Sequence, residues 1–467
     1  MKKNIQNLYL SLPVSVQNIL VSIYGIGIYR QRYGFGSRKF DKCLNVSQYY
    51  SQEQMRDYQD KKFLYIAKLS IRYVPFYRDW AKRNNVELDD FKSIKDLKYF
   101  PVIEKKQIQE SPGSFISDRH RDRKLIELST SGSTGTPLKI YCDQKTRTFH
   151  YAFFTRVRSW YGINKRSKRA TFLGRVVVSG KQKTPPYWRY DAVQKNLIMS
   201  SYHLSEENME FYYRELNKFK PEEIFGYASS IYFLALYIMR QNLNPIQLKI
   251  VMTTAETLMP YQREVIEKAF NCVVVDQYGC TEMAFFASQC KSGSMLFHPE
   301  HSVIEVRDHG SGIIRNTGSG ELVATSLINE AMPLIRYRVG DSVLISEMND
   351  VLYPSFPKIT ELEGRTDDLI YTKDGRKIGR LSPIFRSDKN IKSSQVVQKI
   401  DGSVDIYVVP DQGYTTTHRE LILSEAAERI GCSLSINVFE VDCLKKENNG
   451  KFRPVKSFYK PGLSGSS

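Results

Sequence analysis

The stretch Ser129-Thr-Ser-Gly-Ser-Thr-Gly-Thr-Pro-Leu-Lys139 decides how this chain is interpreted, and short apolar runs, Leu125–Leu128 and Leu138–Tyr141, flank it as expected strands. Consecutive glycine and small hydroxyl residues let N–H and O–H groups converge on phosphate oxygens without steric obstruction. The Gly-Lys-Ser/Thr ending of a Walker A loop is absent, and a strand rather than a helix follows. The segment predicts a phosphate-binding loop of another kind, although taken alone it is equally consistent with a flexible Ser/Gly turn.

Strands alternate with helices on the C-terminal side of this loop. Ile224–Tyr227 is expected as a strand that leads into a helix over Ile231–Arg240. Leu248–Thr253 is a second strand, followed by a helix over Pro260–Phe270 and a strand over Cys272–Val275. This alternation favours an α/β layered core with a largely parallel sheet.

The two flanks of the core have different patterns. Residues from Gln52 to Arg83 have near-helical apolar spacing, whereas His301–Ile345 contains short strands with Gly-rich turns, as in an antiparallel meander. The last hundred residues predict two hairpins, a helix over His418–Ile430 and a final strand over Leu434–Val441. We expect an α/β fold in three parts: a helical N-terminal extension (1–60), a large domain of layered sheets and helices (61–364), and a small α+β lid domain joined by a hinge (365–467).

Composition and charge narrow the class of protein. The chain has 467 residues, of which 41% are apolar and 25% charged, which excludes a wholly disordered chain. Lys and Arg exceed Asp and Glu by 68 − 50 = 18, which indicates an anionic partner. A non-catalytic protein that binds nucleic acid or a membrane surface is one alternative. The basic residues are scattered from Lys2 to Lys460 rather than clustered among aromatics, so we expect no nucleic-acid partner.

Features of the N-terminal region and the cysteines suggest a cytoplasmic location, with contact at the inner face of the membrane as an open alternative. The seven cysteines form no CxxC pair, and we expect reduced thiols. The stretch Leu12–Tyr29 is too polar to span a membrane and lacks a following cleavage site. Tyrosines and arginines gather near its end, so this segment either packs as a helix on its own domain or lies on a membrane surface.

Further short motifs follow the Ser/Gly loop in a fixed order. They are Thr254-Ala-Glu-Thr257, Asp276-Gln-Tyr-Gly-Cys-Thr-Glu282, Arg336-Tyr-Arg-Val-Gly-Asp341, Gly364-Arg-Thr-Asp-Asp368 and Asn449-Gly-Lys-Phe-Arg453. Each motif alone is short enough to arise by chance. Together, from about Tyr58 to Lys456, they resemble the adenylate-forming acyl ligases, within them the phenylacetate–CoA ligase-like branch that includes capsular-polysaccharide biosynthesis proteins.

The resemblance implies an enzyme with two half-reactions. A carboxylate attacks the α-phosphate of ATP to give an acyl-adenylate and pyrophosphate, so catalysis depends on positioning and on stabilising charge at phosphoryl oxygens. The acyl group then passes to an acceptor, either the thiol of coenzyme A or an amino or hydroxyl group of a sugar in capsular or surface polysaccharide biosynthesis. The small domain is expected to swing about the hinge between these steps.

The resemblance also implies roles for individual residues. Those expected around the phosphates are Thr130, Ser131, Gly132, Ser133, Thr134, Gly135 and Lys139, and those expected around the adenosine are Ala255, Glu256, Asp276, Tyr278, Gly279, Asp341 and Arg365. Lys139 is one place later than the family's usual position. Thr281 is expected to touch the α-phosphate, Glu282 to hold Mg²⁺, Asp367 to act as the hinge and Lys451 to be the catalytic lysine.

Two further expectations concern the substrate and a metal. The acyl pocket is expected to contain Tyr227, Ser229 and Ser230, with Trp160 or its neighbours, and its small hydroxylated residues favour a short or polar acid. Several relatives bind zinc through a Cys and a His in this region and a later Cys-x-Cys. Cys290 and His298 are present here, with His301 nearby, but residues 351–358 contain no cysteine, so we expect no bound zinc.

Overall fold

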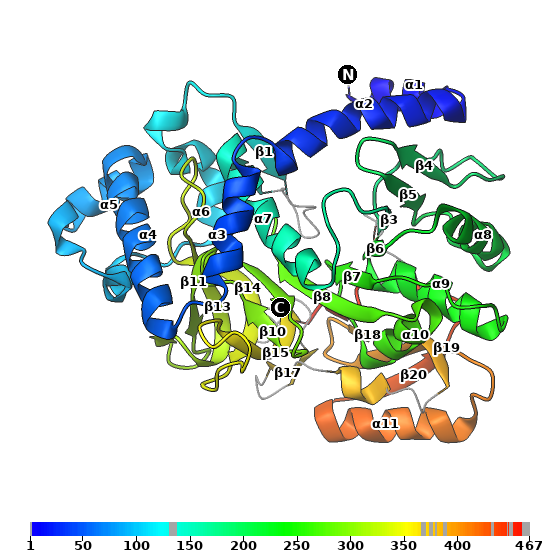
Figure 1. Ribbon diagram of the computed structural model, residues 1–467. Helices are drawn as coiled ribbons and strands as arrows, with labels where there is room; N and C mark the ends of the chain where they lie inside the picture. Colours follow the sequence, from blue (N-terminus) through cyan, green and yellow to red (C-terminus); the bar gives the residue numbers. More distant parts are fainter. Residues whose placement is uncertain are drawn as a thin grey trace.

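The computed structural model describes residues 2–129, 138–365, 370–372, 377–378, 381–385, 390–430, 434–445, 447 and 452–459. Helices and strands alternate through its central part, which confirms the predicted α/β class (Figure 1). The helices are α1 (Lys2–Ser11), α2 (Val14–Tyr33), α3 (Ser37–Ser47), α4 (Gln52–Tyr73), α5 (Pro75–Arg83), α6 (Lys105–Glu110), α7 (Gln144–Trp160), α8 (Met209–Phe219), α9 (Ala228–Arg240), α10 (Pro260–Phe270) and α11 (Thr416–Ile430).

Thirteen strands of the described chain form one sheet, in the order β12-β11-β13-β14-β15-β10-β9-β8-β7-β6-β3-β5-β4. The strands of its parallel half are β3 (Arg169–Leu173), β5 (Asn196–Ser200), β6 (Glu223–Gly226), β7 (Ile250–Thr254) and β8 (Val273–Gly279), with β4 (Trp188–Asp191) antiparallel at the edge. The antiparallel half consists of β9 (Phe286–Gln289), β10 (Met295–Phe297), β11 (Ser302–Arg307), β12 (Ile314–Arg315), β13 (Gly318–Ser326), β14 (Tyr337–Ile345) and β15 (Lys358–Arg365). One continuous sheet therefore joins two kinds of strand pairing.

Helices cover the parallel half on both faces, so its strands carry buried residues that point to either face. Helices α8, α9 and α10 pack on one face, and α3 and α7 on the other. At the end of β6 the backbone passes so close to Phe172 that a Cβ on Gly226 would overlap the Phe172 carbonyl. Glycine is therefore required there, and it allows the tight exit of the chain into α9.

The antiparallel half is covered by α4 and α5, whose buried aromatic and aliphatic residues form a second core with β11, β13 and β14. A capping box begins α4: the Ser51 hydroxyl accepts from the Gln54 amide, and the Gln54 side chain accepts from the Ser51 amide. A short hairpin of β1 (Ile126–Ser129) and β2 (Lys139–Cys142) flanks the Ser/Gly loop. The two predicted strands on either side of that loop are thus present.

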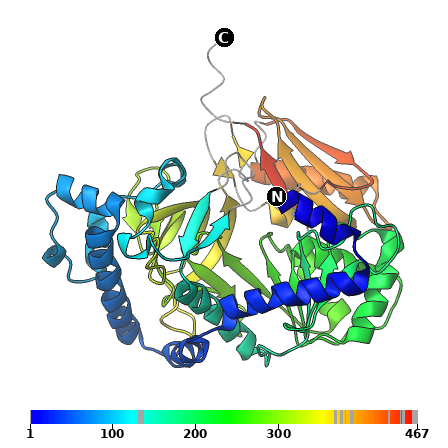
Figure 2. The same cartoon turned by 90° about the horizontal axis from the view of Figure 1, so that it is seen from above.

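The C-terminal part has its own sheet, in the order β20-β19-β18-β21, with α11 packed on it (Figure 2). Its strands are β18 (Ile391–Gln398), β19 (Val404–Pro410), β20 (Ile436–Glu440) and β21 (Val455–Ser457), and β16 (Ile370–Tyr371) pairs with β17 (Lys377–Ile378). Its buried residues are continuous with the core around α9 and α10. An ion pair of 2.5 Å between Arg240 at the end of α9 and Asp411 also joins the two parts.

Helix α2 packs on its own chain, as one of the two alternatives for Leu12–Tyr29 expects, and it contacts β4 and α7. Several residues on its inward side are polar. Asn18 Oδ1 accepts from the Tyr190 amide over 2.9 Å, and a Cβ on Gly25 would overlap the Asp191 carboxylate. In the described part of the chain, no helix has the length and apolar character needed to cross a bilayer.

Candidate active site

The carboxyl ends of the parallel strands meet along one edge of the sheet, where α/β proteins bind ligands. The segments that leave this edge are 174–175 after β3, Tyr227 after β6, 255–256 after β7 and 280–283 after β8. All except the first contain residues expected at the site from the sequence.

Tyr278 near the end of β8 is joined to Asp341 on β14. The Tyr278 hydroxyl donates to Asp341 Oδ2 over 2.7 Å, and the Tyr278 ring packs against Phe285 with centroids 4.7 Å apart. Both residues are half-buried, so each keeps a surface for a ligand. Where β14 pairs with β15, Asp341 is the backbone partner of Arg365, the other residue expected at the ribose.

Glu282 and Thr281 lie on the turn after β8. Glu282 is buried and accepts a hydrogen bond of 3.0 Å from the Tyr337 hydroxyl, whereas Thr281 is exposed. Burial first and then the Glu282 carboxylate raise the pKa of Tyr337, which therefore stays a donor. Within the described residues no Lys or Arg pairs with Glu282. A buried carboxylate without a protein cation fits a magnesium ligand.

Asp276 on β8 is held by hydrogen bonds from two sides. Its Oδ1 accepts from the Thr253 hydroxyl over 2.6 Å, and its backbone amide donates to Gln289 over 3.0 Å. Burial raises the pKa of Asp276 to about 6, against the smaller opposing effects of Thr253 and Arg263. A carboxylate whose pKa is shifted by burial, at the carboxyl edge of a parallel sheet, is a pattern found at functional sites.

Glu256 connects three segments at this edge. Its carboxylate accepts from the Ser229 amide (2.9 Å) and hydroxyl (3.1 Å), which satisfies a free N–H in the first turn of α9. It also accepts from the Phe452 amide over 2.6 Å. Its neighbour Ala255 is exposed with φ +64°, a left-handed conformation that a non-glycine residue adopts at some cost.

The residues expected in the acyl pocket are not all together. Tyr227, Ser229 and Ser230 are buried at the start of α9, and Tyr227 lies near Glu256, Arg175 and the Gly174 amide. Trp160 lies elsewhere: it stacks on Tyr353 with centroids 5.0 Å apart, and its Nε1–H donates to Gln48. These surroundings give no support to a place for Trp160 in the acyl pocket.

Of the other residues expected at the site, Lys139 lies in the described part of the chain and several do not. Lys139 is exposed, and its Nζ lies 3.5 Å from Glu127. The remaining predicted positions lie outside the described residues, namely Thr130, Ser131, Gly132, Ser133, Thr134, Gly135, Asp367 and Lys451.

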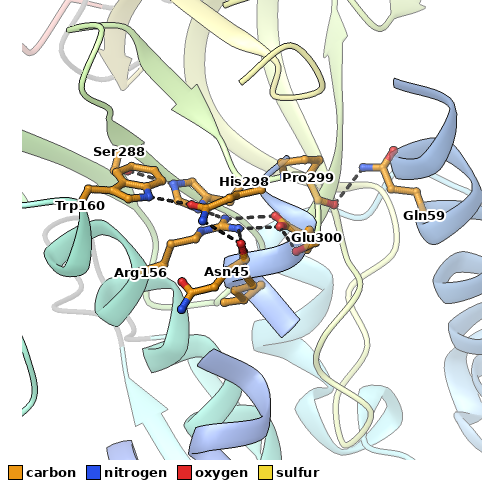
Figure 3. A network of polar contacts seen from close by, with 11 residues as sticks. Asn45, Gln59, Arg156, Trp160, Ser288, His298, Pro299 and Glu300 are labelled. Atoms are coloured by element: carbon orange, nitrogen blue, oxygen red, sulfur yellow. Dashed lines mark hydrogen bonds and ion pairs between the residues drawn. The ribbon is translucent and has the colours of Figure 1, made fainter. Parts of the chain in front are cut away.

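The residues considered for zinc belong to a buried polar network (Figure 3). His298 Nδ1 contacts the Arg156 guanidinium, and its Nε2 lies 2.9 Å from the Ser288 hydroxyl. His301 pairs with His150 over 3.0 Å. Both ring nitrogens of His298 thus have protein partners, and no group of three or more potential ligands in the described residues is arranged to hold a metal.

Sequence reasoning missed several residues at this edge. Tyr337 is part of the quoted Arg336–Asp341 motif, but its hydrogen bond to Glu282 was not anticipated. Arg147 on α7 and Arg175 after β3 belong to no motif. A signal for Arg175 did exist, because it directly follows the strand Arg169–Leu173, but that strand was itself not predicted.

Comparison with known proteins gives consistent matches. Residues 370–457 match the family model of the CapK C-terminal domain. Protein CapK of Staphylococcus aureus is 30% identical over 411 residues, which cover 86% of this chain and 88% of the relative. A phenylacetate-coenzyme A ligase of Aromatoleum evansii is 26% identical and covers 68% of this chain and 72% of the relative.

The fold is shared with solved ligase structures. The structure of 2-hydroxyisobutyryl-CoA ligase in the postadenylation state superposes with a TM-score of 0.70 at 17% identity, covering 88% of this chain and 91% of that one. The relatives of the present chain by sequence and by fold are thus adenylate-forming enzymes. The chain therefore belongs to the CapK family, in the phenylacetate–CoA ligase-like branch of the adenylate-forming acyl ligases.

Proposed function

We propose that this protein is an ATP-dependent ligase that converts a carboxylate into an acyl-adenylate, releases pyrophosphate and transfers the acyl group to an acceptor. The observation that carries the proposal is the 2.6 Å hydrogen bond from the Phe452 amide to Glu256. Phe452 directly follows Lys451 in the sequence, and Glu256 belongs to the edge that also holds Tyr278, Glu282 and Asp341. The contact therefore joins the segment of the proposed catalytic lysine to the proposed nucleotide site.

In this proposal the adenosine lies between the two halves of the sheet. The Tyr278 ring supplies a flat apolar surface for adenine, and the Asp341 carboxylate accepts from ribose hydroxyls. Asp276, Ala255, Glu256 and Gly279 border the base, and Arg365 adds a contact near the ribose. The small and hydroxylated residues 130–135, with Lys139, surround the β- and γ-phosphates.

Activation of the acid requires positive charge near the α-phosphate. Lys451 would supply a point charge to the phosphoryl oxygens and to the attacking carboxylate, and Thr281 would donate a hydrogen bond to the α-phosphate. Glu282 would hold Mg²⁺, which neutralises phosphate charge when bound. The acid itself would enter beside Tyr227, Ser229 and Ser230.

The acceptor is proposed from the relatives. Phenylacetate-coenzyme A ligases and 2-hydroxyisobutyryl-CoA ligase use coenzyme A by name, whereas the name CapK points to capsule formation and thus to an amino or hydroxy sugar. We propose transfer in capsular or surface polysaccharide biosynthesis, with the coenzyme A thioester as the alternative product. Rotation of the C-terminal part about Asp367 would exchange the faces used in the two half-reactions.

The test is acid-dependent exchange of labelled pyrophosphate into ATP, which requires no acceptor. We expect exchange with at least one acid of a broad panel and its loss in Lys451→Ala. Absence of exchange with every acid, together with no rise in melting temperature on adding Mg-ATP, would contradict the proposal. Once an acid is found, an acceptor screen with coenzyme A and amino sugars separates thioester from amide or ester formation.

A further inference from the structure

Three arginines converge on one tyrosine at the carboxyl edge of the sheet. Arg32 comes from α2, Arg147 from α7 and Arg175 from the segment after β3. The guanidinium carbons of Arg32 and Arg147 lie 4.6 and 4.8 Å from the centroid of the Tyr151 ring, and Arg147 Nη2 donates to the Tyr151 hydroxyl over 3.3 Å. Three cationic side chains from distant parts of the sequence therefore share one phenol.

In the described part of the chain, none of the three arginines forms an ion pair with an Asp or Glu. The Asp191 carboxylate, which lines the cavity beside Arg32 and Arg175, accepts from Gln194 instead. Arg32 donates to the neutral amide of Gln194 over 3.3 Å, and Arg147 Nη1 approaches Met283 Sδ at 3.8 Å. The Nε–H of Arg147 is buried without an acceptor. Neighbouring like charges lose free energy when they are desolvated together unless an anion offsets them.

The positive charge of the cluster shifts the pKa values of nearby groups. Burial alone would raise the pKa of Tyr151, but Arg32, Arg147 and Arg175 together lower it to about 8. Burial and the charge of Arg32 lower the pKa of Arg175. Both shifts reflect a positive potential that no ion pair among the described residues offsets.

The cluster borders the proposed acid site. Arg175 acts electrostatically on Tyr227, whose hydroxyl bonds the Gly174 amide, and Arg147 reaches Met283, the residue after Glu282. Arg175 keeps exposed surface, so a ligand can reach it. A cavity of about 50 Å³ beside Arg32 and Arg175 continues from the cluster toward α2.

We propose that the Arg32–Arg147–Arg175 cluster binds a second anionic group of the acid substrate, so that the acid is a dicarboxylate or a phosphorylated carboxylate. This inference rests on the proposed function. One carboxylate of the substrate reacts with ATP, and the other anionic group stays with the arginines. Guanidinium groups suit this role because they form two parallel hydrogen bonds to carboxylate or phosphate.

The experiment compares matched acids in pyrophosphate exchange with the full-length protein. The pairs are butanoate against succinate, and glycerate against 3-phosphoglycerate, so that the two arms separate a second carboxylate from a phosphate. We expect the better dianionic acid to exceed its monoanionic partner at least 10-fold in kcat/KM. Arg175→Gln and Arg32→Gln should reduce this preference at least 10-fold through KM, and Arg175→Lys should restore part of it. Arg166→Gln, an exposed arginine outside the cluster, should leave it unchanged.

The outcomes separate this inference from the proposed function. Exchange with monoanionic acids that equals or exceeds exchange with dianionic ones would overturn the inference and leave the ligase activity standing. An unchanged preference for dianionic acids in Arg175→Gln, combined with a raised KM for the acceptor, would also overturn the inference. The cluster would then serve a phosphate of the acceptor. Exchange with no acid at all would count against the proposed function itself. As a measurement without turnover, the favoured dianion should raise the tyrosinate titration midpoint of Tyr151, identified by difference from Tyr151→Phe.

A second inference comes from the opposite face of α2. Gln17, Asn18, Ser22 and Gly25 face the protein, with Val21 and Ile28 at the cavity, whereas a stripe of the outward positions is apolar. The outward stripe consists of Val16, Ile19, Leu20, Ile23 and Ile26, between 37% and 59% exposed. Exposed apolar surface of this regular spacing marks a site of interaction.

We infer that this stripe lies on an anionic lipid bilayer, with α2 parallel to the surface. The charge favours lipid over a protein groove: Arg30 near the end of α2 is exposed, as are Arg38 and Lys39 in the first turn of α3. Phe35 is fully exposed and Tyr24 is 67% exposed. Aromatic and basic residues around an apolar helix face are the usual composition of an interfacial helix. Figures 1 and 2 show α2 along the outside of the molecule, where a planar surface can reach it.

Vesicle flotation tests this inference. The full-length protein should float with phosphatidylcholine vesicles that contain 30% phosphatidylserine, and less with phosphatidylcholine alone. Ile19→Ser with Ile23→Ser should reduce the bound fraction at least 5-fold, while Ile400→Ser, at an even more exposed isoleucine elsewhere, should not. No flotation, flotation unaffected by the double change, or self-association that the double change abolishes would each overturn it. Unchanged melting temperatures show that the variants fold.

Discussion

The hydroxyl of Tyr278 donates a hydrogen bond of 2.7 Å to Oδ2 of Asp341, across 63 positions in the sequence. Tyr278 lies near the end of the last parallel strand, and Asp341 lies within an antiparallel strand of the same sheet. The bond fixes the orientation of the Asp341 carboxylate. It therefore joins the proposed adenine surface to the proposed ribose acceptor.

Tyr278→Phe tests how much this orientation matters for ATP. The variant keeps the aromatic ring but removes the hydroxyl, so a net hydrogen-bond contribution of about 0.5–1.5 kcal/mol predicts an increase in KM for ATP of about 2- to 13-fold. Asp341→Ala removes the ribose acceptor as well and should weaken ATP binding further. Pyrophosphate exchange at varied ATP measures both. Equal effects of the two changes would show that Asp341 acts only through Tyr278.

Glu256→Ala is expected to affect the two half-reactions unequally. The change removes the acceptor of the Phe452 amide and leaves the Ser229 amide without its partner. Loss of charge-assisted hydrogen bonds of about 1.5–3 kcal/mol each predicts a fall in adenylation of about 10- to 150-fold. Transfer from a preformed acyl-adenylate in single-turnover experiments should fall less. Glu256→Gln, which keeps an acceptor oxygen, serves as the control and should lie between wild type and alanine.

Asp276 is expected to reduce stability at neutral pH. Its pKa is raised from 3.8 to about 6 in the folded protein, so the folded state binds the proton more tightly than the unfolded chain. The free energy of unfolding therefore falls as pH rises between about 4 and 6, and the cost stays present above pH 6. Asp276→Asn removes the charge, so urea unfolding should show the variant about 1–3 kcal/mol more stable at pH 7.5. The difference should shrink at pH 4.5, and a constant difference would point to a steric cause.

The local pattern of the sequence predicted the elements that carry strong boundary signals. Pro260 fixes the start of α10, and the predicted helix over 260–270 agrees with the structure at both ends. By contrast, the five-residue strands Arg169–Leu173 and Asn196–Ser200 were not predicted. Gly174 follows the first strand, but neither Gly nor Pro borders the second. Short apolar runs of this kind do not distinguish a strand from a buried helix.

The candidate site was predictable where neighbouring residues form a motif and not where distant segments meet. Tyr278 and Asp341 were each identified from local motifs, but their hydrogen bond depends on a sheet that joins β8 to β14 through three intervening strands. The arginine cluster combines residues 32, 147 and 175, and no sequence period connects them. The polar inward face of α2 also escaped prediction, because helical spacing shows which residues share a face but not which face is buried.

The buried histidines predict a loss of stability in acid. Burial is the main cause that lowers the pKa values of His150, His298 and His301 below the ordinary 6.5, to about 3 for His301. Because the unfolded chain takes up protons first as pH falls below 6.5, each histidine costs about 1.4 kcal/mol per pH unit there. Urea unfolding at pH 7.5 and 5.5 measures the loss, and His301→Asn should show a smaller one. An equal loss in the variant would assign the effect to other groups.

The buried Arg156–Glu300 pair gives the last prediction. Its side chains are 1% and 0% exposed and joined by two hydrogen bonds of 2.5 and 3.1 Å, and Ser47 donates to the same carboxylate over 2.6 Å (Figure 3). Glu300→Gln leaves a buried guanidinium without its counter-charge, and we expect a loss of about 3–5 kcal/mol in unfolding free energy. Arg156→Met alone should cost a similar amount, because Glu300 then stays charged and unpaired. The double variant, Arg156→Met with Glu300→Gln, should recover most of the stability, since it removes both charges.

As a control, Glu210→Gln breaks an ion pair with the 74% exposed Arg214 and should cost less than about 1 kcal/mol. If the double variant instead shows the sum of the two single losses, the residues act independently. If it recovers and keeps its pyrophosphate exchange, the pair serves to fix α7, which carries Arg147 and Tyr151, rather than to take part in the chemistry.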